Sequence, residues 1–391
     1  MLALVLFVVL GLADSRPNPE TNHKILRLIP GNDAQFEALS IFYEERLFGL
    51  EFLGGRPKPE ATLDVKIADD QEENFLWLLG REKIDFVQIF PTDYEKRPDS
   101  LAPLDKCGIF EFGKYCEYNA MIRYIKRLAS TFPELTKIAK IGETYHGRPI
   151  MAIKVGNQGK NPKRSVVIDA GIHAREWATS HTALYYVNEL IHGYGRDKNI
   201  SQLLDTHNVW VVPNLNPDGY EYSRSADLKE VRWWRKNRGP QRFINGSDCS
   251  GVDLNRNFEF HWEEGEHAKD PCSVEYHGSE AFSERESRAI RDLLNSPELL
   301  HKTDLYLTVH SYGGYILFPY NHKPDSYPED HDQSKSVAQT AAEAINAAGN
   351  AKYEAGTVPS LLKYLAAGAS MDWAKKTASV KLSYTLRKGN F

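Results

Sequence analysis

Residues Ser165–Trp177 have the sequence SVVIDAGIHAREW, in which an apolar run leads directly into a histidine and a glutamate. The run from Ser165 to Ile172 is rich in β-branched residues and predicts a buried β-strand. His173 follows it, and Glu176 comes three residues later, a spacing at which both side chains can reach one point. In open α/β sheets, ligands bind beyond the carboxyl ends of the strands. We therefore expect a functional site at this strand end.

A second apolar run ends in the same way. Residues 304–310 read DLYLTVH, so that His310 also stands at the end of a predicted strand. Two histidines and one carboxylate, with a fourth position left to water, are typical of a hydrolytic zinc site, whereas structural zinc sites use four protein ligands. A single H-x-x-E motif is common by chance and carries little weight alone. The two strand-end histidines together predict a Zn²⁺ site formed by His173, Glu176 and His310.

The composition is that of a soluble globular protein. The 391 residues are 41% hydrophobic and 26% charged, with a formal net charge of -5, and this length suggests two or three domains. Because the chain is mildly acidic, we expect neither nucleic acid nor a membrane among its partners. Nothing in the sequence indicates an obligate oligomer, and we expect a monomer.

The amino terminus and the cysteines indicate the compartment. Residues 2–12, LALVLFVVLGL, are an apolar run too short to span a bilayer, and small residues follow it as in a signal peptide. We expect residues 1–13 to be a signal peptide and the protein to be secreted and extracellular. Four cysteines predict two disulfides, and Cys107–Cys116 with Cys249–Cys272 is the simplest of three connectivities.

Residues 22–93 predict a small first domain. Strand-like and helix-like runs alternate there in the order strand, helix, strand, helix, strand, which describes a small α/β layer. A segment rich in Pro, Asp and basic residues follows at 91–104, and Lys96, Arg97 and Lys106 are candidate cleavage sites for an activating trypsin-like protease. We interpret residues 14–106 as a propeptide domain with its activation linker, although an ordinary interdomain linker is an equally good interpretation.

From residue 107 to residue 391, long helical runs alternate with apolar strands. We expect helices at 118–132, 177–193, 283–294 and 333–348, and strands at 165–172, 209–212, 304–309 and 380–386. This alternation predicts an α/β domain with a largely buried mixed sheet.

These residues resemble the zinc carboxypeptidases of the carboxypeptidase A/B family, which are secreted proenzymes with an open-sandwich prodomain. The resemblance covers nearly the whole chain and is carried by HAREW, VRWWRKNR, DLNRNF, TVHSYGG and KYLAAGASMDW. It implies that His173, Glu176 and His310 bind zinc, and that the C-termini of peptides or proteins are the substrates. It also implies a disulfide between Cys249 and Cys272.

The resemblance assigns further roles around the metal. Arg235 matches the arginine that polarises the scissile carbonyl, and Asp253 matches the acid that orients a zinc-ligand histidine. The matches to substrate-binding positions are Arg175, Asn255, Arg256, Tyr312 and Tyr364. The chemistry agrees, because an arginine binds a terminal carboxylate through two parallel hydrogen bonds and a cation near the metal stabilises a developing oxyanion. Taken alone, Arg235 also fits a solvated surface segment or a nucleic-acid patch, Asp253 a loop acid, and Tyr364 a core residue.

One residue bears on substrate specificity. In the family, the floor of the side-chain pocket is an acid where Lys or Arg is removed, and an apolar residue where aromatic or aliphatic residues are removed. Met371 occupies this position. We therefore expect hydrolysis of apolar or aromatic C-terminal residues.

The last predicted strand departs from the family. The family carries its catalytic glutamate in a segment of the form YTFELR, whereas this chain reads Ser383-Tyr-Thr-Leu-Arg387 and stops at Phe391. We expect that two residues, including the glutamate, and the helix that normally follows are missing, so that the domain is truncated at its C-terminus. Because general acid–base catalysis contributes about 10²–10⁴-fold, a second hypothesis is a zinc-binding protein that binds peptides without turning them over. A structural zinc site is disfavoured, since the sequence offers no fourth protein ligand.

Overall fold

The computed structural model describes residues 23–44, 50–52, 63–88, 107, 110, 112, 114–159, 164–225, 229–244, 246–265, 268–348 and 352–388. The predicted signal peptide and the candidate cleavage residues Lys96, Arg97 and Lys106 lie outside these ranges. The chain forms two compact units, one of residues 1–102 with 362–364 and one of residues 103–361 with 365–391. Within the described ranges, no helix is both long and apolar enough to cross a membrane.

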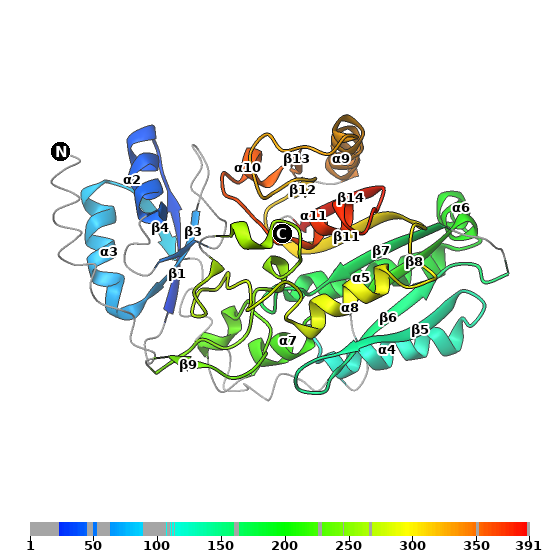
Figure 1. Cartoon of the computed structure of the whole chain (residues 1–391). Helices are drawn as coiled ribbons and strands as arrows, with labels where there is room; N and C mark the ends of the chain where they lie inside the picture. Colours follow the sequence, from blue (N-terminus) through cyan, green and yellow to red (C-terminus); the bar gives the residue numbers. More distant parts are fainter. Residues whose placement is uncertain are drawn as a thin grey trace. The chain divides into compact units, whose positions relative to one another are not determined.

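The first unit is an antiparallel sheet with the strand order β2-β3-β1-β4 and two helices (Figure 1). Leu28 of β1 and Val65 of β3 are buried with Phe42 and Phe75, one from each helix. The predicted order of strands and helices is confirmed, and β2 is an addition whose two residues are too few to show an alternating pattern. The elements are β1 (His23–Ile29), α2 (Asp33–Glu44), β2 (Glu51–Phe52), β3 (Leu63–Ala68), α3 (Asp69–Arg81) and β4 (Asp85–Gln88).

The second unit is built on an eight-stranded sheet with the order β13-β12-β14-β11-β7-β8-β6-β5, which confirms the prediction of a mixed sheet. Its centre is parallel, because β14, β11, β7 and β8 run in one direction, while β6 and β5 are antiparallel additions at one end. The strands are β5 (Thr136–Glu143), β6 (Pro149–Val155), β7 (Arg164–Ala170), β8 (His207–Val212), β11 (Thr303–Ser311), β12 (Tyr315–Leu317), β13 (Glu354–Gly356) and β14 (Leu382–Lys388), with the pair β9 (Phe243–Ile244) and β10 (Ser247–Asp248) apart.

Helices cover both faces of this sheet (Figure 1). Successive side chains of a strand point to opposite faces, so Val309 of β11 joins the core under α4, α5 and α6, whereas Tyr306 joins the core under α8 and α11. The helices are α4 (Tyr118–Thr131), α5 (Trp177–Gly193), α6 (Lys198–Thr206), α7 (Pro217–Ser223), α8 (Arg285–Leu294), α9 (His331–Ala348), α10 (Val358–Leu361) and α11 (Ser370–Lys376), and the short 3₁₀ turns are η3 (Lys229–Trp233), η4 (Leu254–Arg256) and η5 (Trp262–Glu264).

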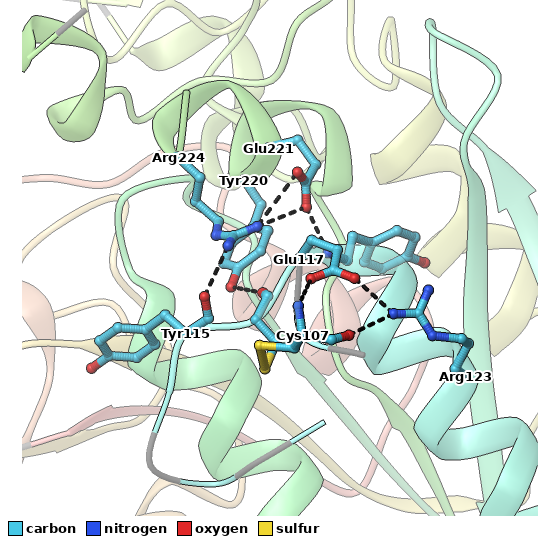
Figure 2. The surroundings of a disulfide bond; sticks show 9 residues. Cys107, Tyr115, Glu117, Arg123, Tyr220, Glu221 and Arg224 are labelled. Carbon is cyan, nitrogen blue, oxygen red and sulfur yellow. Dashed lines mark hydrogen bonds and ion pairs between the residues drawn. A yellow bond between two sulfur atoms is a disulfide. The ribbon is translucent and has the colours of Figure 1, made fainter. Parts of the chain in front are cut away.

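Two disulfides have the pairing predicted as simplest, Cys107–Cys116 and Cys249–Cys272. Figure 2 shows how polar groups hold the first of them. Glu117 accepts a hydrogen bond from the backbone N–H of Cys107, and Arg123 donates to the carbonyl of Cys107 and pairs with Glu117. Tyr220 of α7 donates to the carbonyl of Cys116. The disulfide thus closes a loop within the segment before α4, and the hydrogen bond from Tyr220 holds that loop against α7.

Candidate metal and substrate site

Two neighbouring strands bring the predicted zinc ligands together. The chain leaves β7 through Gly171, whose φ of +66° is readily adopted only by glycine, and reaches His173 two residues later. Glu176 is the residue immediately before α5. Since β7 and β11 are parallel neighbours, their carboxyl ends meet at one edge of the sheet. His173 therefore lies beside His310, which follows 137 residues later in the chain.

The three side chains converge on one point. Nδ1 of His173 lies 2.8 Å from Oε1 of Glu176 and 3.2 Å from Nδ1 of His310, and the latter nitrogen lies 3.3 Å from Oε2 of Glu176. All three side chains are buried, with 3–7% of their surface exposed. A tetrahedral zinc ion with ligands at about 2.0–2.2 Å keeps those ligands roughly 3.3–3.6 Å apart. The observed separations are close to that requirement.

The second ring nitrogen of His173 is held by a carboxylate. Nε2 of His173 lies 3.1 Å from Oδ1 of Asp253. The other oxygen of Asp253 accepts a hydrogen bond of 2.8 Å from Nε of Arg235 and lies 2.7 Å from its Nη2. A carboxylate at the far nitrogen of a metal-binding histidine fixes the orientation and the tautomer of the ring. Asp253 thus has the position that the sequence predicts for it, and it brings the Arg235 guanidinium to the edge of the group.

His310 is held by two polar residues that the sequence analysis missed. Oγ1 of Thr308 lies 3.3 Å from Nε2 of His310 and donates a hydrogen bond of 2.9 Å to Oδ1 of Asp169. Thr308 and Asp169 are register partners in β11 and β7. A signal for them exists in the sequence, because Asp169 interrupts an apolar strand and Thr308 stands two residues before His310, on the same strand face.

The charges of the group suit a metal ion. Burial raises the pKa of Glu176, but the adjacent His173 and His310 outweigh this effect and hold that pKa well below its ordinary value. Burial likewise raises the pKa of Asp253, and Arg235 and His173 outweigh it, so that the pKa is again well below its ordinary value. Burial lowers the pKa of His310 to about 4, so this imidazole is neutral at pH 7. Ionised carboxylates and neutral imidazoles are the forms that bind metals.

These residues therefore fit a zinc ion by geometry and by ionisation. His173, Glu176 and His310 would supply three ligands to it. When bound, zinc supplies a Lewis acid that polarises a carbonyl group and lowers the pKa of a bound water to about 7. Asp253, Thr308 and Asn255 would keep both imidazoles in place.

Asn255 and Arg256 lie beside the metal-ligand group in η4. Nδ2 of Asn255 lies 3.4 Å from Nε2 of His310. Arg256 is buried, donates a hydrogen bond of 3.0 Å from Nη1 to the Asn255 carbonyl, and forms an ion pair of 3.0 Å through Nη2 with Glu275. An amide and a guanidinium are thus adjacent, as a site for a terminal carboxylate requires.

Met371 lies next to a residue that is hydrogen-bonded to the same turn. The backbone N–H of Ser370 donates a hydrogen bond of 2.9 Å to Oδ1 of Asn255, which fixes the start of α11. Met371 is the next residue and is fully buried, and its carbonyl accepts a hydrogen bond from the Ser383 hydroxyl on β14. Gly368, with φ of +69°, precedes this start, and a Cβ there would overlap the carbonyl of Arg256.

The remaining predicted substrate residues lie in loops. Arg175 stands between two metal ligands, and its carbonyl accepts a hydrogen bond of 2.9 Å from Arg232. Tyr312 follows β11 directly, and its carbonyl accepts a hydrogen bond from Arg387. Tyr364 is half-buried and belongs to the segment 362–364 of the first compact unit, so its role at the site stays a prediction.

The last strand, β14, carries no acidic residue. β14 pairs with β11 without a shift from Leu382 to Lys388, and Arg387 lies opposite His310. Without a gap, the glutamate of the pattern YTFELR aligns with Arg387, and with two residues missing before Leu386 it has no counterpart. The strand pairs continuously in either case, so the loss of two residues stays a prediction.

Comparisons with known proteins agree with this geometry. A profile of the zinc carboxypeptidase family matches residues 121–390. Carboxypeptidase B from Astacus astacus is 36% identical over 276 residues, covering 71% of this chain and 86% of that protein, and carboxypeptidase A2 from Rattus norvegicus is 31% identical over 357 residues, covering 90% and 82%. The crystal structure of the carboxypeptidase A from Helicoverpa armigera matches with a TM-score of 0.79 at 27% identity, covering 95% of this chain and 89% of that one. The chain belongs to the zinc carboxypeptidase family.

Proposed function

We propose that the protein is a zinc metallocarboxypeptidase that hydrolyses apolar or aromatic residues from peptide C-termini. The observation that carries the proposal is the convergence of His173 Nδ1, His310 Nδ1 and the Glu176 carboxylate within 3.3 Å of one another, with the Arg235 guanidinium held beside them. This arrangement combines a zinc-type ligand set with a cation that can stabilise an oxyanion.

The clamp for the substrate's terminal carboxylate is Arg256 with Asn255. Arg256 is a permanent, planar cation that is buried near the metal ligands, where a carboxylate is bound more strongly than at the surface. Arg175, Tyr312 and Tyr364 are the further substrate contacts in this proposal. Binding of the terminal carboxylate by Arg256 would fix the last peptide bond relative to Arg235 and the metal.

Apolar specificity rests on Met371. Its side chain is fully buried and uncharged. Met371 directly follows Ser370, whose backbone N–H donates a hydrogen bond to Asn255. A pocket with an apolar floor favours Phe, Tyr, Leu, Ile or Val, because a Lys or Arg side chain would lose its hydration there without gaining a counter-charge. Carboxypeptidases of both the A and the B kind are among the relatives, so this preference has to be measured.

We further propose that the protein is made as a secreted zymogen and acts as a monomer. The apolar leader at residues 2–12 and the two disulfides support export, since disulfides persist in oxidising compartments. The compact unit that precedes the catalytic domain supports a propeptide, and the basic residues Lys96, Arg97 and Lys106 supply cleavage sites for a trypsin-like protease.

A second candidate function is zinc-dependent binding of peptide C-termini without turnover. The observation that favours it is that β14 carries no acidic residue from Leu382 to Lys388 and places Arg387 opposite His310. An arginine cannot accept a proton at neutral pH, so it cannot act as the general base.

One experiment separates the two candidates. The full chain is expressed as a secreted protein, treated with trypsin, analysed for zinc, and assayed on blocked peptides ending in Phe or in Lys. Turnover that is faster on the Phe-ended peptide supports the proposed enzyme. One zinc ion per catalytic site with tight binding of the Phe-ended peptide and no turnover would support the binding protein instead.

A further inference from the structure

The H-x-x-E spacing of the catalytic ligands recurs at His261 and Glu264. His261 is the residue before the short turn η5 and has φ of +53°, an uncommon conformation for a residue other than glycine. Nδ1 of His261 lies 2.5 Å from Oε1 of Glu264. The segment thus points an imidazole and a carboxylate at each other.

A third side chain joins this pair from a separate loop. His322 stacks on His261, with ring centroids 3.7 Å apart and ring planes 5° apart. The potential ligand atoms of His261, Glu264 and His322 all lie within 4.8 Å of one another. Two histidines and a glutamate are the same residue types as in the catalytic group. The spacing alone is not sufficient, because His277 and Glu280 share it and belong to no such group among the described residues.

His322 gives an independent indication of a ligand. It is 6% exposed, and its Nδ1 is buried without a hydrogen-bond partner in the described structure. Its other nitrogen lies 3.4 Å from the Ser326 hydroxyl. A buried polar atom without a partner is destabilising, and a bound ion is one of the ways in which proteins satisfy it. Burial also lowers the pKa of His322 to about 4, so the imidazole is neutral at pH 7.

The group is open to solvent on one side. His261 and His322 line a surface hollow of about 560 Å³, together with Tyr327, Asp330 and Lys375. Lys375 forms an ion pair with Asp330 at 2.6 Å, and Lys376 and Glu329 line the same hollow. The side chain of Glu264 is 54% exposed and that of His261 is 34% exposed, so both have room to turn towards an ion.

We propose that His261, Glu264 and His322 form a second metal site for a divalent cation of the zinc type, separate from the catalytic group. Two imidazoles select Zn²⁺, Cu²⁺ or Ni²⁺ over Ca²⁺ and Mg²⁺, which prefer oxygen ligands. The stacked rings have to turn apart for both to face one ion, and His261 is the exposed ring that can move.

The position of this site connects it to the segment that carries Met371. The backbone N–H of Gly368 donates to the carbonyl of Phe260, the neighbour of His261, and the N–H of Ala366 donates to the carbonyl of Asn321, the neighbour of His322. An ion bound to both His261 and His322 would therefore link the two backbone segments whose carbonyls accept hydrogen bonds from residues 366–368. We expect its binding to raise the melting temperature of the protein.

The test is a count of tightly bound zinc in the full chain. The protein is loaded with Zn²⁺, freed of excess metal by gel filtration and analysed for zinc per chain. We expect two ions in the parent protein and one in each of His261→Asn, Glu264→Gln and His322→Gln. Glu263→Gln, which changes the exposed neighbouring acid, is the matched control and should retain two. His173→Gln should also retain one ion, and with Co²⁺ this variant should show the visible absorption of a site with nitrogen ligands.

Two results would overturn the proposal. The first is one zinc ion per chain in the parent protein and in Glu264→Gln alike. The second is a second ion that persists in all three site variants, which would place it elsewhere. Because Glu264→Gln changes an exposed side chain and His261→Asn a partly exposed one, they keep the test valid even if His322→Gln fails to fold. The catalytic proposal has its own readout in turnover, so either proposal can fail without the other.

Discussion

Arg387 on β14 lies opposite His310 on β11 in an unbroken parallel register. His310 points to the same sheet face as Tyr306 and Thr308, and the alternation of β14 directs Arg387 to that face as well. The guanidinium donates a hydrogen bond of 3.1 Å from Nε to the carbonyl of Tyr312. The metal-ligand group thus has a cation beside it on this face of the sheet.

The first prediction concerns this cation. We expect Arg387→Glu to raise kcat on a blocked peptide ending in Phe by about 10²–10⁴-fold, because the new carboxylate supplies the missing general base. Arg387→Gln is the matched control, since it removes the charge without adding a base. Equal rates for the two variants, with zinc bound in both, would show that a carboxylate at this position does not assist the reaction.

The second prediction concerns the carboxylate behind His173. Asp253→Asn should weaken zinc binding by roughly 10–100-fold, because Asp253 orients the His173 ring and anchors Arg235. The affinity is measured by competition with a chelator. Asp292→Asn, an exposed acid on α8, should leave the affinity unchanged. A zinc affinity in Asp253→Asn equal to that of the parent would contradict the role of Asp253.

The third prediction concerns specificity. Met371→Asp should lower the ratio of kcat/KM for Phe-ended over Lys-ended peptides by roughly tenfold or more, because a charged floor repels an apolar side chain and pairs with a basic one. Met371→Leu keeps the apolar floor and should keep the ratio. The melting temperatures of both variants show whether either change disturbs the fold. An unchanged ratio in a folded Met371→Asp variant would show that Met371 does not line the specificity pocket.

The fourth prediction concerns the ion pair of Arg256. Glu275 lies 3.0 Å from Nη2 of Arg256 and competes for the guanidinium with a substrate carboxylate. Glu275→Gln should therefore lower KM by up to about fivefold with little change in kcat, since partly exposed pairs contribute ~0.2–1 kcal/mol. Asp270→Asn, nearby in the same loop, is the control. A higher KM in Glu275→Gln would mean that Glu275 orients Arg256 for binding.

The fifth prediction concerns stability and pH. Burial raises the pKa of Glu286 in α8 to about 7, from an ordinary value of 4.5. Between these values the folded protein holds a proton that the unfolded chain has released, so this group makes the protein less stable as pH rises from about 4.5 to about 7. A shift of this size corresponds to roughly 3 kcal/mol. Glu286→Gln should remove this pH-dependent loss of stability. The melting temperature of the variant minus that of the parent should therefore be larger at pH 8 than at pH 5.

The exposed acid Glu134 provides the comparison for this experiment. Glu134→Gln should shift the melting temperature little at either pH. If Glu286→Gln and Glu134→Gln behave alike, burial of Glu286 does not govern the pH dependence.

Local features of this protein follow from short stretches of sequence. The strand that ends before His173, the spacing of His173 and Glu176, and the helix from Trp177 are all encoded within about 30 residues, where the alternation of a strand or the period of a helix is visible. The strands β12 and β13, with three residues each, are too short to show a period, and the longer strands β5 and β6 were not predicted either.

The meeting of distant residues was decided by the tertiary structure. His310 meets His173 because β7 and β11 are parallel neighbours, and Thr308 meets Asp169 because of their register. The register also decides that Arg387 lies opposite His310. Likewise, the H-x-x-E motif of His261 and Glu264 gains a third potential ligand only because the fold stacks His322 on His261. Pairing register and packing depend on the whole sheet and its loops, so no local pattern of residues contains them.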